Sequence, residues 1–265
     1  MMKNVLKAIF RIAVPERYKS HVYTLYWYLR EPSVIRPDLA RKRWMKSSYR
    51  PFDNKCRENF FLSATSFLWT NRDDRLKNGY YLEFGSFGAV TMRMAWRHTR
   101  HFFNLTYIAF DSFEGLPEID KIDEQPIWQK GRLAMSEPDF RGVALSEGLP
   151  KDRLITVKGF YDLTLTRDLQ RQFLPLKASI IYIDCDLYKS TVPVLKFIVP
   201  FLQVGTVIAF DDWNCFWADP NRGQRLAWRE FVAEHPELHF ESFVSTHGLM
   251  SFVSTGPTRG CAELS

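Results

Sequence analysis

The sequence has few cysteines and no long hydrophobic run. The four cysteines of the 265-residue chain are scattered and form no CxxC pair: Cys56, Cys185, Cys215 and Cys261. This usage is unlike a disulfide framework and favours a reducing, cytoplasmic location. No stretch approaches the roughly 20 apolar residues that a membrane-spanning helix requires. Arg11 interrupts the apolar run near the start and no convincing cleavage site follows, so we expect no signal peptide.

Acidic residues are scarce only in the N-terminal part of the chain. Residues 1–75 carry 16 Lys and Arg against 7 Asp and Glu, whereas the other 190 residues carry 20 against 23. The net charge of +6 therefore belongs to this segment, and we expect no nucleic-acid partner. We interpret residues 1–75 as a basic helical cap on a domain formed by residues 76–265. The cap is a solvated face, a contact with an anionic membrane surface, or a lid for an acidic substrate; the composition leaves these open.

Two apolar segments of the second half each end in carboxylates. Residues 179–183 read as a buried strand and lead into Asp184 and Asp186, while residues 206–210 lead into Asp211 and Asp212. Open parallel sheets bind ligands outside the carboxyl ends of their strands, and neighbouring strands lie roughly 4.8 Å apart. One divalent cation could therefore bridge both strand ends, and Mg²⁺ prefers such oxygen ligands.

The first half contains a strand, a glycine turn and a helix. Residues 80–85 read as a strand that contains Glu83 and ends at Gly85, and residues 92–102 read as the helix. A helix start after such a turn presents free N–H groups to an anion. A second strand ends at Asp111, about 25 residues beyond the turn, where an acid suits the hydroxyls of a ribose.

The remaining pattern completes an alternating order of strands and helices. Further strands are expected at 154–160, 238–245 and 249–254, and further helices at 163–173, 191–202 and 223–235. Residues 118–150 are polar and irregular, which is typical of a lid. This order predicts an α/β fold with a doubly wound, mostly parallel Rossmann-like sheet and a C-terminal antiparallel hairpin. It is the outline of a class I methyltransferase domain, which strand counting alone does not separate from other Rossmann-like folds.

With these stretches assembled, the chain resembles the macrocin O-methyltransferase family. Four stretches carry the likeness: Tyr81-Leu-Glu-Phe-Gly85, Phe110-Asp-Ser-Phe-Glu-Gly-Leu-Pro-Glu118, Asp184-Cys-Asp-Leu-Tyr-Lys-Ser-Thr191 and Phe210-Asp-Asp-Trp213. Together the matching stretches span about residues 80–232. The resemblance implies an enzyme that uses S-adenosylmethionine and Mg²⁺ to methylate a hydroxyl of a sugar or another small natural product.

The family's functional residues carry over by motif. The resemblance implies that Asp184, Asp211 and Asp212 ligate Mg²⁺, with Asp186 as a fourth participant or a helix N-cap. It implies a cofactor site formed by Glu83, Phe84, Gly85, Asp111, Ser112, Phe113 and Glu114. Of these, the first three would face the methionine part of the cofactor and the other four its ribose and adenine. Whether the protein forms homo-oligomers stays open.

Two departures from the family pattern leave the catalytic base unknown. The turn after Gly85 is shorter than usual in the family, and residues 102–234 contain no histidine. A metal-linked carboxylate, Lys130 and His247 are the candidates for the base. The alternatives to a methyltransferase are a nucleotide-sugar glycosyltransferase that uses Asp184-Cys-Asp186, and a non-catalytic cofactor-fold binding module. The first does not explain Glu83 to Gly85 or the second pair of acids.

Overall fold

A computed structural model of the chain describes residues 37–71 and 73–256. The chain divides into two compact units, residues 1–55 and residues 56–265. The predicted cap ended at residue 75, whereas this division falls inside a helix. In the first unit the described residues form helix α3 (Pro37–Trp44), the π-helical turn η1 (Met45–Tyr49) and the start of α4 (Arg50–Asn71). The stretch expected to lack a signal peptide lies outside the described residues.

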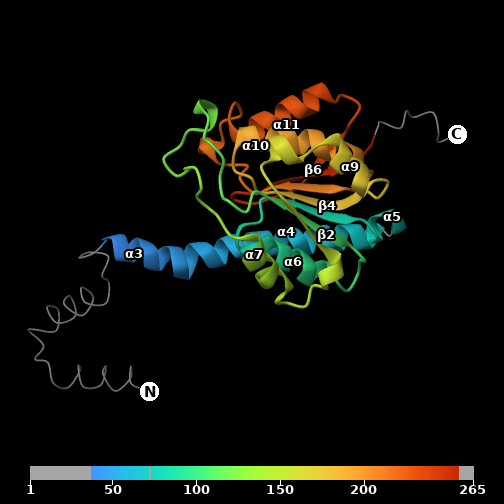
Figure 1. The fold of residues 1–265 in the computed structure, drawn as a ribbon, viewed down its shortest axis with the longest axis horizontal. Helices are drawn as coiled ribbons and strands as arrows, with labels where there is room; N and C mark the ends of the chain where they lie inside the picture. The colour runs from blue at the N-terminus through green and yellow to red at the C-terminus, as the bar shows by residue number, and fades with distance from the viewer. Residues whose placement is uncertain (1–36, 72, 257–265) are drawn as a thin grey trace, which may run out of the picture. The chain divides into compact units, whose positions relative to one another are not determined.

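The second unit is built on one seven-stranded sheet (Figure 1). Its strand order is β3-β2-β1-β4-β5-β7-β6, with β7 antiparallel to both of its neighbours and the other contacts parallel. The strands are β1 (Tyr80–Phe84), β2 (Thr106–Asp111), β3 (Leu154–Lys158), β4 (Ala178–Ile183), β5 (Val207–Phe210), β6 (Phe240–Ser245) and β7 (Met250–Ser254). The predicted doubly wound sheet with its C-terminal hairpin is confirmed.

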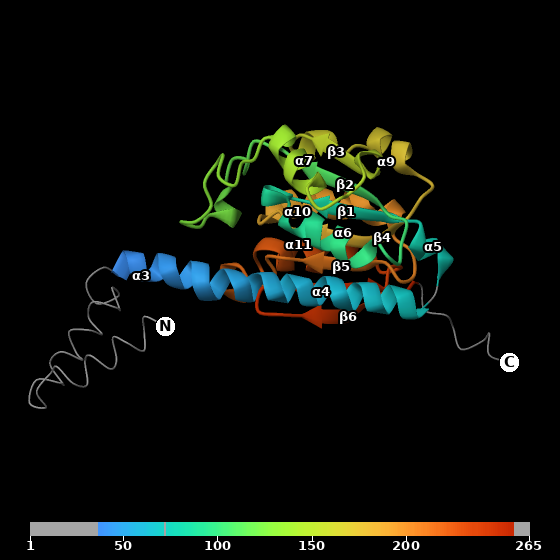
Figure 2. The ribbon, with the colours of Figure 1, turned by 90° about the horizontal axis from the view of Figure 1, so that it is seen from below.

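Helices cover both faces of this sheet (Figures 1 and 2). One face packs against α4 from Cys56 onward, α6 (Val90–Thr99) and α7 (Glu137–Leu145), and the other against α9 (Arg167–Phe173), α10 (Tyr188–Ile198) and α11 (Gly223–Glu234). Because both faces are covered, the central strands β1, β4 and β5 are buried along their whole length. Two short helices, α5 (Asp74–Lys77) and α8 (Tyr161–Thr164), complete the α-helices described.

Helix α7 corrects the prediction that residues 118–150 are irregular throughout. Ser136 is its N-cap, and its side chain accepts a hydrogen bond from the backbone N–H of Asp139 (3.3 Å). Pro138 lies in the first turn, where a missing N–H costs nothing. Phe140 and Ala144 then bury one face of the helix. Ser136 and Pro138 are the sequence features that indicate this helix. The polar composition of residues 118–150 led to the prediction of an irregular segment instead.

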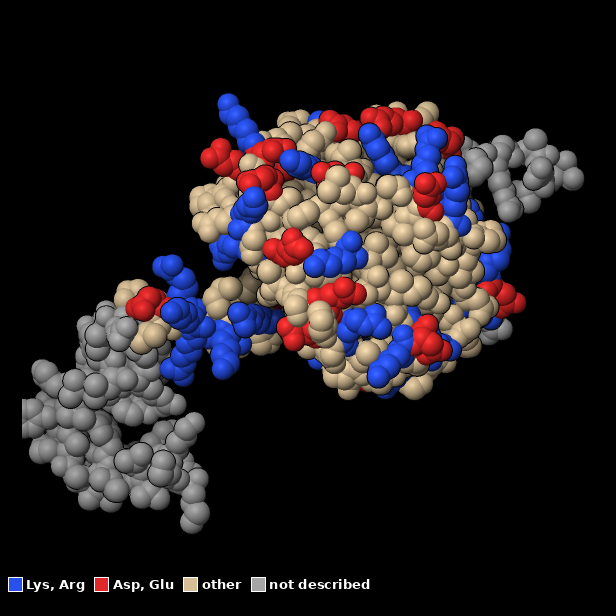
Figure 3. All heavy atoms as spheres, in the orientation of Figure 1, with Lys and Arg blue, Asp and Glu red and all other residues tan. Residues whose placement is uncertain are grey.

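Charge is distributed differently over the two units. Figure 3 shows Lys and Arg concentrated on α3 and the start of α4, whereas both signs are mixed over the rest of the described surface. Arg41, Lys42, Arg43 and Lys46 are all exposed. Among the helices of residues 37–71 and 73–256, none is long and apolar enough to cross a membrane.

Candidate functional site

The carboxyl ends of β4 and β5 bring three acids together. The two strands are parallel neighbours, with Ile183 opposite Phe210, so the residues that follow them leave the sheet side by side. One carboxylate oxygen from each of Asp184, Asp211 and Asp212 lies within 4.8 Å of the others. The predicted meeting of the strand ends is therefore present in the fold, and oxygen ligands at this spacing suit a hard divalent cation.

Burial and neighbouring negative charges raise the pKa values of Asp184 and Asp212. Burial is the main cause that raises the pKa of Asp184 well above its usual range, and the charges of Asp211 and Asp212 add to it. Burial raises the pKa of Asp212 in the same way, with the charges of Asp186 and Asp211 contributing. Carboxylates at this distance resist ionisation unless a positive charge joins them. The surroundings of Asp184 and Asp212 therefore favour a cation.

Asp211 already has two side-chain partners. The guanidinium of Arg57, on α4, donates from Nε to Oδ1 (3.0 Å) and from Nη2 to Oδ2 (2.5 Å). The hydroxyl of Tyr182, from β4, donates a second bond to Oδ1. Neither residue was identified from the sequence, although both had a signal. Arg57 continues the stripe of buried residues on α4 (Phe60, Phe61, Ala64, Leu68), and Tyr182 stands two residues before Asp184 on the same face of its strand.

Asp186 does not cap the helix that follows it. Its backbone N–H donates to Asp212 Oδ2 (3.1 Å), and its φ of 61° turns the chain sharply before α10. The N-cap of α10 is Leu187, which has no capping side chain. The backbone N–H groups of Tyr188 and Lys189 instead donate to the carboxylate of Asp123 (2.7 and 3.1 Å). The N-cap alternative for Asp186 is therefore wrong, because an acid from the irregular segment holds that place.

Asp123 and Arg222 fasten the irregular segment to the helix starts beside the acids. Asp123 is fully buried. The guanidinium of Arg222 donates from Nε to the carbonyl of Ile122 (3.1 Å) and from Nη2 to that of Glu124 (2.9 Å), and it lies 4.5 Å from the ring centre of Phe216. Residues 122–124 of the irregular segment are therefore held against the start of α10 and against the loop that follows Asp212.

The end of β1 presents buried polar atoms. Glu83 is fully buried and accepts a hydrogen bond at Oε2 from the Tyr81 hydroxyl. Among the described residues, its Oε1 and the buried hydroxyl of Ser86 make no hydrogen bond of good geometry. The Ser86 and Thr91 hydroxyls nevertheless lie near enough to act on the Glu83 carboxyl and lower its pKa, so the end of β1 is a cluster of buried polar groups. Gly85 lies between Glu83 and Ser86 with φ +86°, packed against the backbone of Asp184.

The acid that ends β2 organises the turn after β1. Asp111 Oδ2 accepts a hydrogen bond from the backbone N–H of Ser86 (2.7 Å), and Oδ1 accepts one from that of Phe113 (2.6 Å). The Ser112 hydroxyl donates to the carbonyl of Gly115 (2.8 Å), and the carboxylate of Glu114 pairs with a lysine at 3.1 Å. Asp111 therefore joins the two loops to which the resemblance assigns cofactor contacts.

Two residues of the predicted cofactor site place their rings in the core. Phe84 stacks on Phe110 with ring centres 4.6 Å apart, and Phe113 packs on Phe140 at 5.5 Å. Both rings are buried. Any contact of Phe84 with a cofactor would therefore come from its main chain.

The two side chains considered as bases are placed differently. Lys130 is exposed and forms an ion pair with Glu118. His247 lies in the turn between β6 and β7, where its carbonyl accepts a hydrogen bond from Asn214 Nδ2 (2.7 Å). The neighbouring Gly248 approaches the backbone carbonyl of Asp211, which lies 3.3 Å from the position of an added Cβ. The hairpin turn is thus close to the acid cluster.

Replacing Glu83 by glutamine is expected to remove the contribution of this carboxyl to a fall in stability between about pH 4.5 and 7. Burial raises the pKa of Glu83 to about 7 from an ordinary value of 4.5. Between these values the unfolded chain releases a proton that the folded chain keeps, so stability is greatest at low pH and declines as the pH rises through this window. The full loss amounts to roughly 3 kcal/mol.

Thermal unfolding of both proteins from pH 4 to 8 measures this difference. The wild-type and Glu83→Gln proteins should agree near pH 4, and the variant should be the more stable one above pH 7. A constant difference across the range would show that the Glu83 carboxyl is not the titrating group.

Comparisons with known proteins were made against family models, curated proteins and solved structures. The model of the macrocin-O-methyltransferase (TylF) family matches residues 79–237. The comparison with curated proteins finds no match.

Two solved methyltransferases share the fold. The O-methyltransferase NovP is 20% identical, with a TM-score of 0.59 over 75% of this chain and 79% of its own. The calicheamicin methyltransferase CalS11 is 18% identical, with a TM-score of 0.61 over 94% and 90%. A second structure of CalS11, described as a TDP-rhamnose 3'-O-methyltransferase, gives a TM-score of 0.53 over 85% and 92% at 18% identity. The strand order, the acids beyond β4 and β5 and the family match agree: the chain belongs to the macrocin-O-methyltransferase family and is an O-methyltransferase.

Proposed function

We propose that this enzyme transfers a methyl group from S-adenosylmethionine to a hydroxyl of a sugar or similar small natural product, with Mg²⁺ bound at Asp184, Asp211 and Asp212. The observation that carries the proposal is the convergence of these three carboxylates within 4.8 Å, beyond the strand that neighbours β1 and its glycine turn. A metal-assisted methyl transfer requires both features in one crevice.

The donor set supports a hard divalent cation. All three ligands are carboxylates, and burial with mutual repulsion raises the pKa values of Asp184 and Asp212. A positive ion would relieve that repulsion. When bound, Mg²⁺ would polarise the acceptor hydroxyl and lower its pKa.

The turn after β1 supports the cofactor. The buried Glu83 Oε1 and Ser86 Oγ are an acceptor and a hydroxyl that could bind the amino and carboxylate groups of the methionine part. Asp111 is the residue that we propose for the ribose, and its bond to Ser86 N–H holds the turn in position. S-adenosylmethionine would supply the methyl group on its sulfonium. The task of these residues is to align the cofactor with the acceptor, which alone supplies a large part of the rate of such a transfer.

The sugar acceptor is supported by the relatives and by the docked segment. CalS11 is described as a TDP-rhamnose O-methyltransferase, and its fold is shared by this chain. The segment fastened by Asp123 and Arg222 lies against the start of α10, which follows the acids, and we propose that it encloses the acceptor. We place the enzyme in the cytoplasm, which agrees with the unpaired cysteines among the described residues, Cys56, Cys185 and Cys215. Membrane contact through the basic N-terminal segment remains part of the proposal.

Calorimetric titration with S-adenosylhomocysteine, with and without Mg²⁺, tests the cofactor. We expect micromolar binding, because the turn offers buried polar atoms and the residue proposed for the ribose. Binding of UDP-sugars in the presence of Mn²⁺ is the control for the glycosyltransferase alternative and should be undetectable. Absence of S-adenosylhomocysteine binding in both conditions would refute the proposed activity.

A further inference from the structure

The acid cluster contains a cation of its own. The Arg57 guanidinium meets Asp211 with two nitrogens, and the two side chains are only 21% and 8% exposed. The pair is therefore well shielded from water, unlike the exposed ion pairs that contribute little. The negative charge of Asp184 also acts on this guanidinium.

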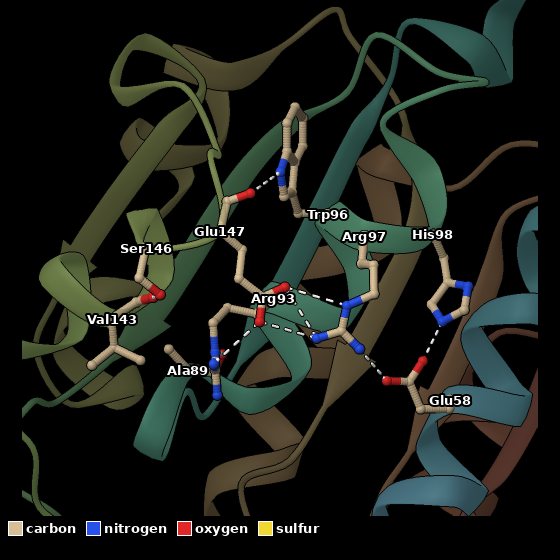
Figure 4. A network of polar contacts seen from close by, with 9 residues as sticks. All are labelled: Glu58, Ala89, Arg93, Trp96, Arg97, His98, Val143, Ser146 and Glu147. Atoms are coloured by element: carbon tan, nitrogen blue, oxygen red, sulfur yellow. Dashed lines mark hydrogen bonds and ion pairs between the residues drawn. The ribbon is translucent and has the colours of Figure 1, made fainter.

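The residues that follow Arg57 on α4 hold this part of the helix in place. Phe60 and Phe61 pack on the ring of Tyr182, with ring centres 5.7 and 5.4 Å apart, and the Tyr182 hydroxyl donates to the same Asp211. The next residue, Glu58, joins α4 to α6. Its carboxylate accepts from Arg97 Nη1 (2.5 Å) and contacts the ring of His98 on α6 (Figure 4). The packing of Phe60 and Phe61 and the contacts of Glu58 therefore hold the part of α4 that carries Arg57. They position its guanidinium beside Asp211.

The pair leaves Asp211 little capacity for another ligand. A carboxylate has about four lone-pair sites. Arg57 uses two and Tyr182 uses a third. A divalent cation bound to Asp211 would in addition lie close to a guanidinium of the same sign, in a site of low exposure where repulsion is weakly screened.

We propose that Arg57 is a resident counter-ion that competes with the divalent metal for Asp211, and so sets the metal affinity of the site. The inference rests on the proposed metal site. In the absence of metal, Arg57 keeps the cluster compact. When metal binds, the guanidinium gives up at least one of its two bonds to Asp211. Arg57 is therefore a positioning residue of the site, and affinity for the metal is lower than the three carboxylates alone would provide.

Calorimetric titration of the full-length protein with Mn²⁺ and with Mg²⁺ tests the inference without reference to activity. Arg57→Gln should bind Mn²⁺ at least about tenfold more tightly than the wild type, because the like charge is removed. Without metal, the variant should unfold at a lower temperature than the wild type, because Asp211 loses its charged partner. Saturating Mn²⁺ should reduce this difference in unfolding temperature.

Two further variants control for charge and for folding. Arg57→Lys keeps the positive charge and should bind Mn²⁺ within about threefold of the wild type. Arg75→Gln removes the same group from an exposed pair with Asp73. This pair lies before β1, at the end of the strands opposite the acids, so neither Mn²⁺ affinity nor the unfolding temperature should change.

The outcomes separate the two proposals. Equal or weaker Mn²⁺ binding by Arg57→Gln, beside clear binding by the wild type, overturns the competition and leaves the metal site intact. An equal gain in Arg57→Lys supports competition for the oxygens of Asp211 and overturns repulsion between like charges as its cause. Absence of binding by every protein overturns the metal site itself. Binding by Arg57→Gln alone would be the strongest support for the competition.

Discussion

Replacing Asp184 by asparagine is expected to lower Mg²⁺-dependent methyl transfer by about 100-fold or more. Changes in the outer shell of metal sites already cost 10- to 100-fold, and Asp184 is a proposed direct ligand. Its replacement, unlike that of Asp211, leaves the Arg57–Asp211 pair intact. The fold should survive, since burial already disfavours the ionised form of Asp184.

The measurement is turnover against Mg²⁺ concentration, beside thermal unfolding and S-adenosylhomocysteine binding. Asp168→Asn is the matched control, because it makes the same chemical change in an exposed pair on α9. The Asp184→Asn protein should keep its cofactor binding and lose its response to the metal. Full turnover with an unchanged Mg²⁺ dependence would remove Asp184 from the metal site.

Replacing Gly85 by alanine is expected to destabilise the protein by at least about 3 kcal/mol and to abolish cofactor binding. An added Cβ would lie 1.8 Å from the backbone carbonyl oxygen of Asp184, and the φ of +86° disfavours any other residue. The strand ends must then separate, which displaces both the turn that holds Ser86 and the first acid of the cluster.

Gly142→Ala is the control for this change. Gly142 lies in α7, is exposed, and has no atom within 4 Å of an added Cβ. Alanine there should stabilise the helix by about 0.5–1 kcal/mol. Denaturant unfolding of both variants gives the two free energies. A Gly85→Ala protein of wild-type stability would mean that β1 and β4 do not make this close approach.

The sheet and the acid cluster could be predicted because their signals are local. Residues 179–183 are apolar and β-branched or aromatic in most positions, and Asp184 follows directly. Because consecutive strands of a parallel sheet are usually neighbours, Asp211 and Asp212 are expected beside Asp184, and the strand pairing shows this arrangement. Even the altered turn after Gly85 was visible in the sequence.

The residues that complete the cluster could not be predicted because their partners are distant in the chain. Arg57 stands 154 residues before Asp211, in a segment where many basic residues suggested a solvated face. In the sequence Asp123 is one acid among several in a polar loop. The backbone N–H of Tyr188, from which it accepts a hydrogen bond, lies 65 residues further along the chain. In both cases a single long-range contact decides the role of the residue, and composition carries no sign of it.

The anchoring of the irregular segment has a consequence for how acceptor preference can diversify. Asp123 and Arg222 fix one short part of it, residues 122–124, to the helix starts beside the acids. The part from residue 125 to residue 135 has Ile127 and Leu133 exposed, and it is also paired with Leu116 through the backbone of Gly131 and Arg132. Under the proposed function, exchanging residues 125–135 would change the surface offered to the acceptor and leave the acids of the cluster in place. Chimaeras between relatives are then best joined just beyond Glu124.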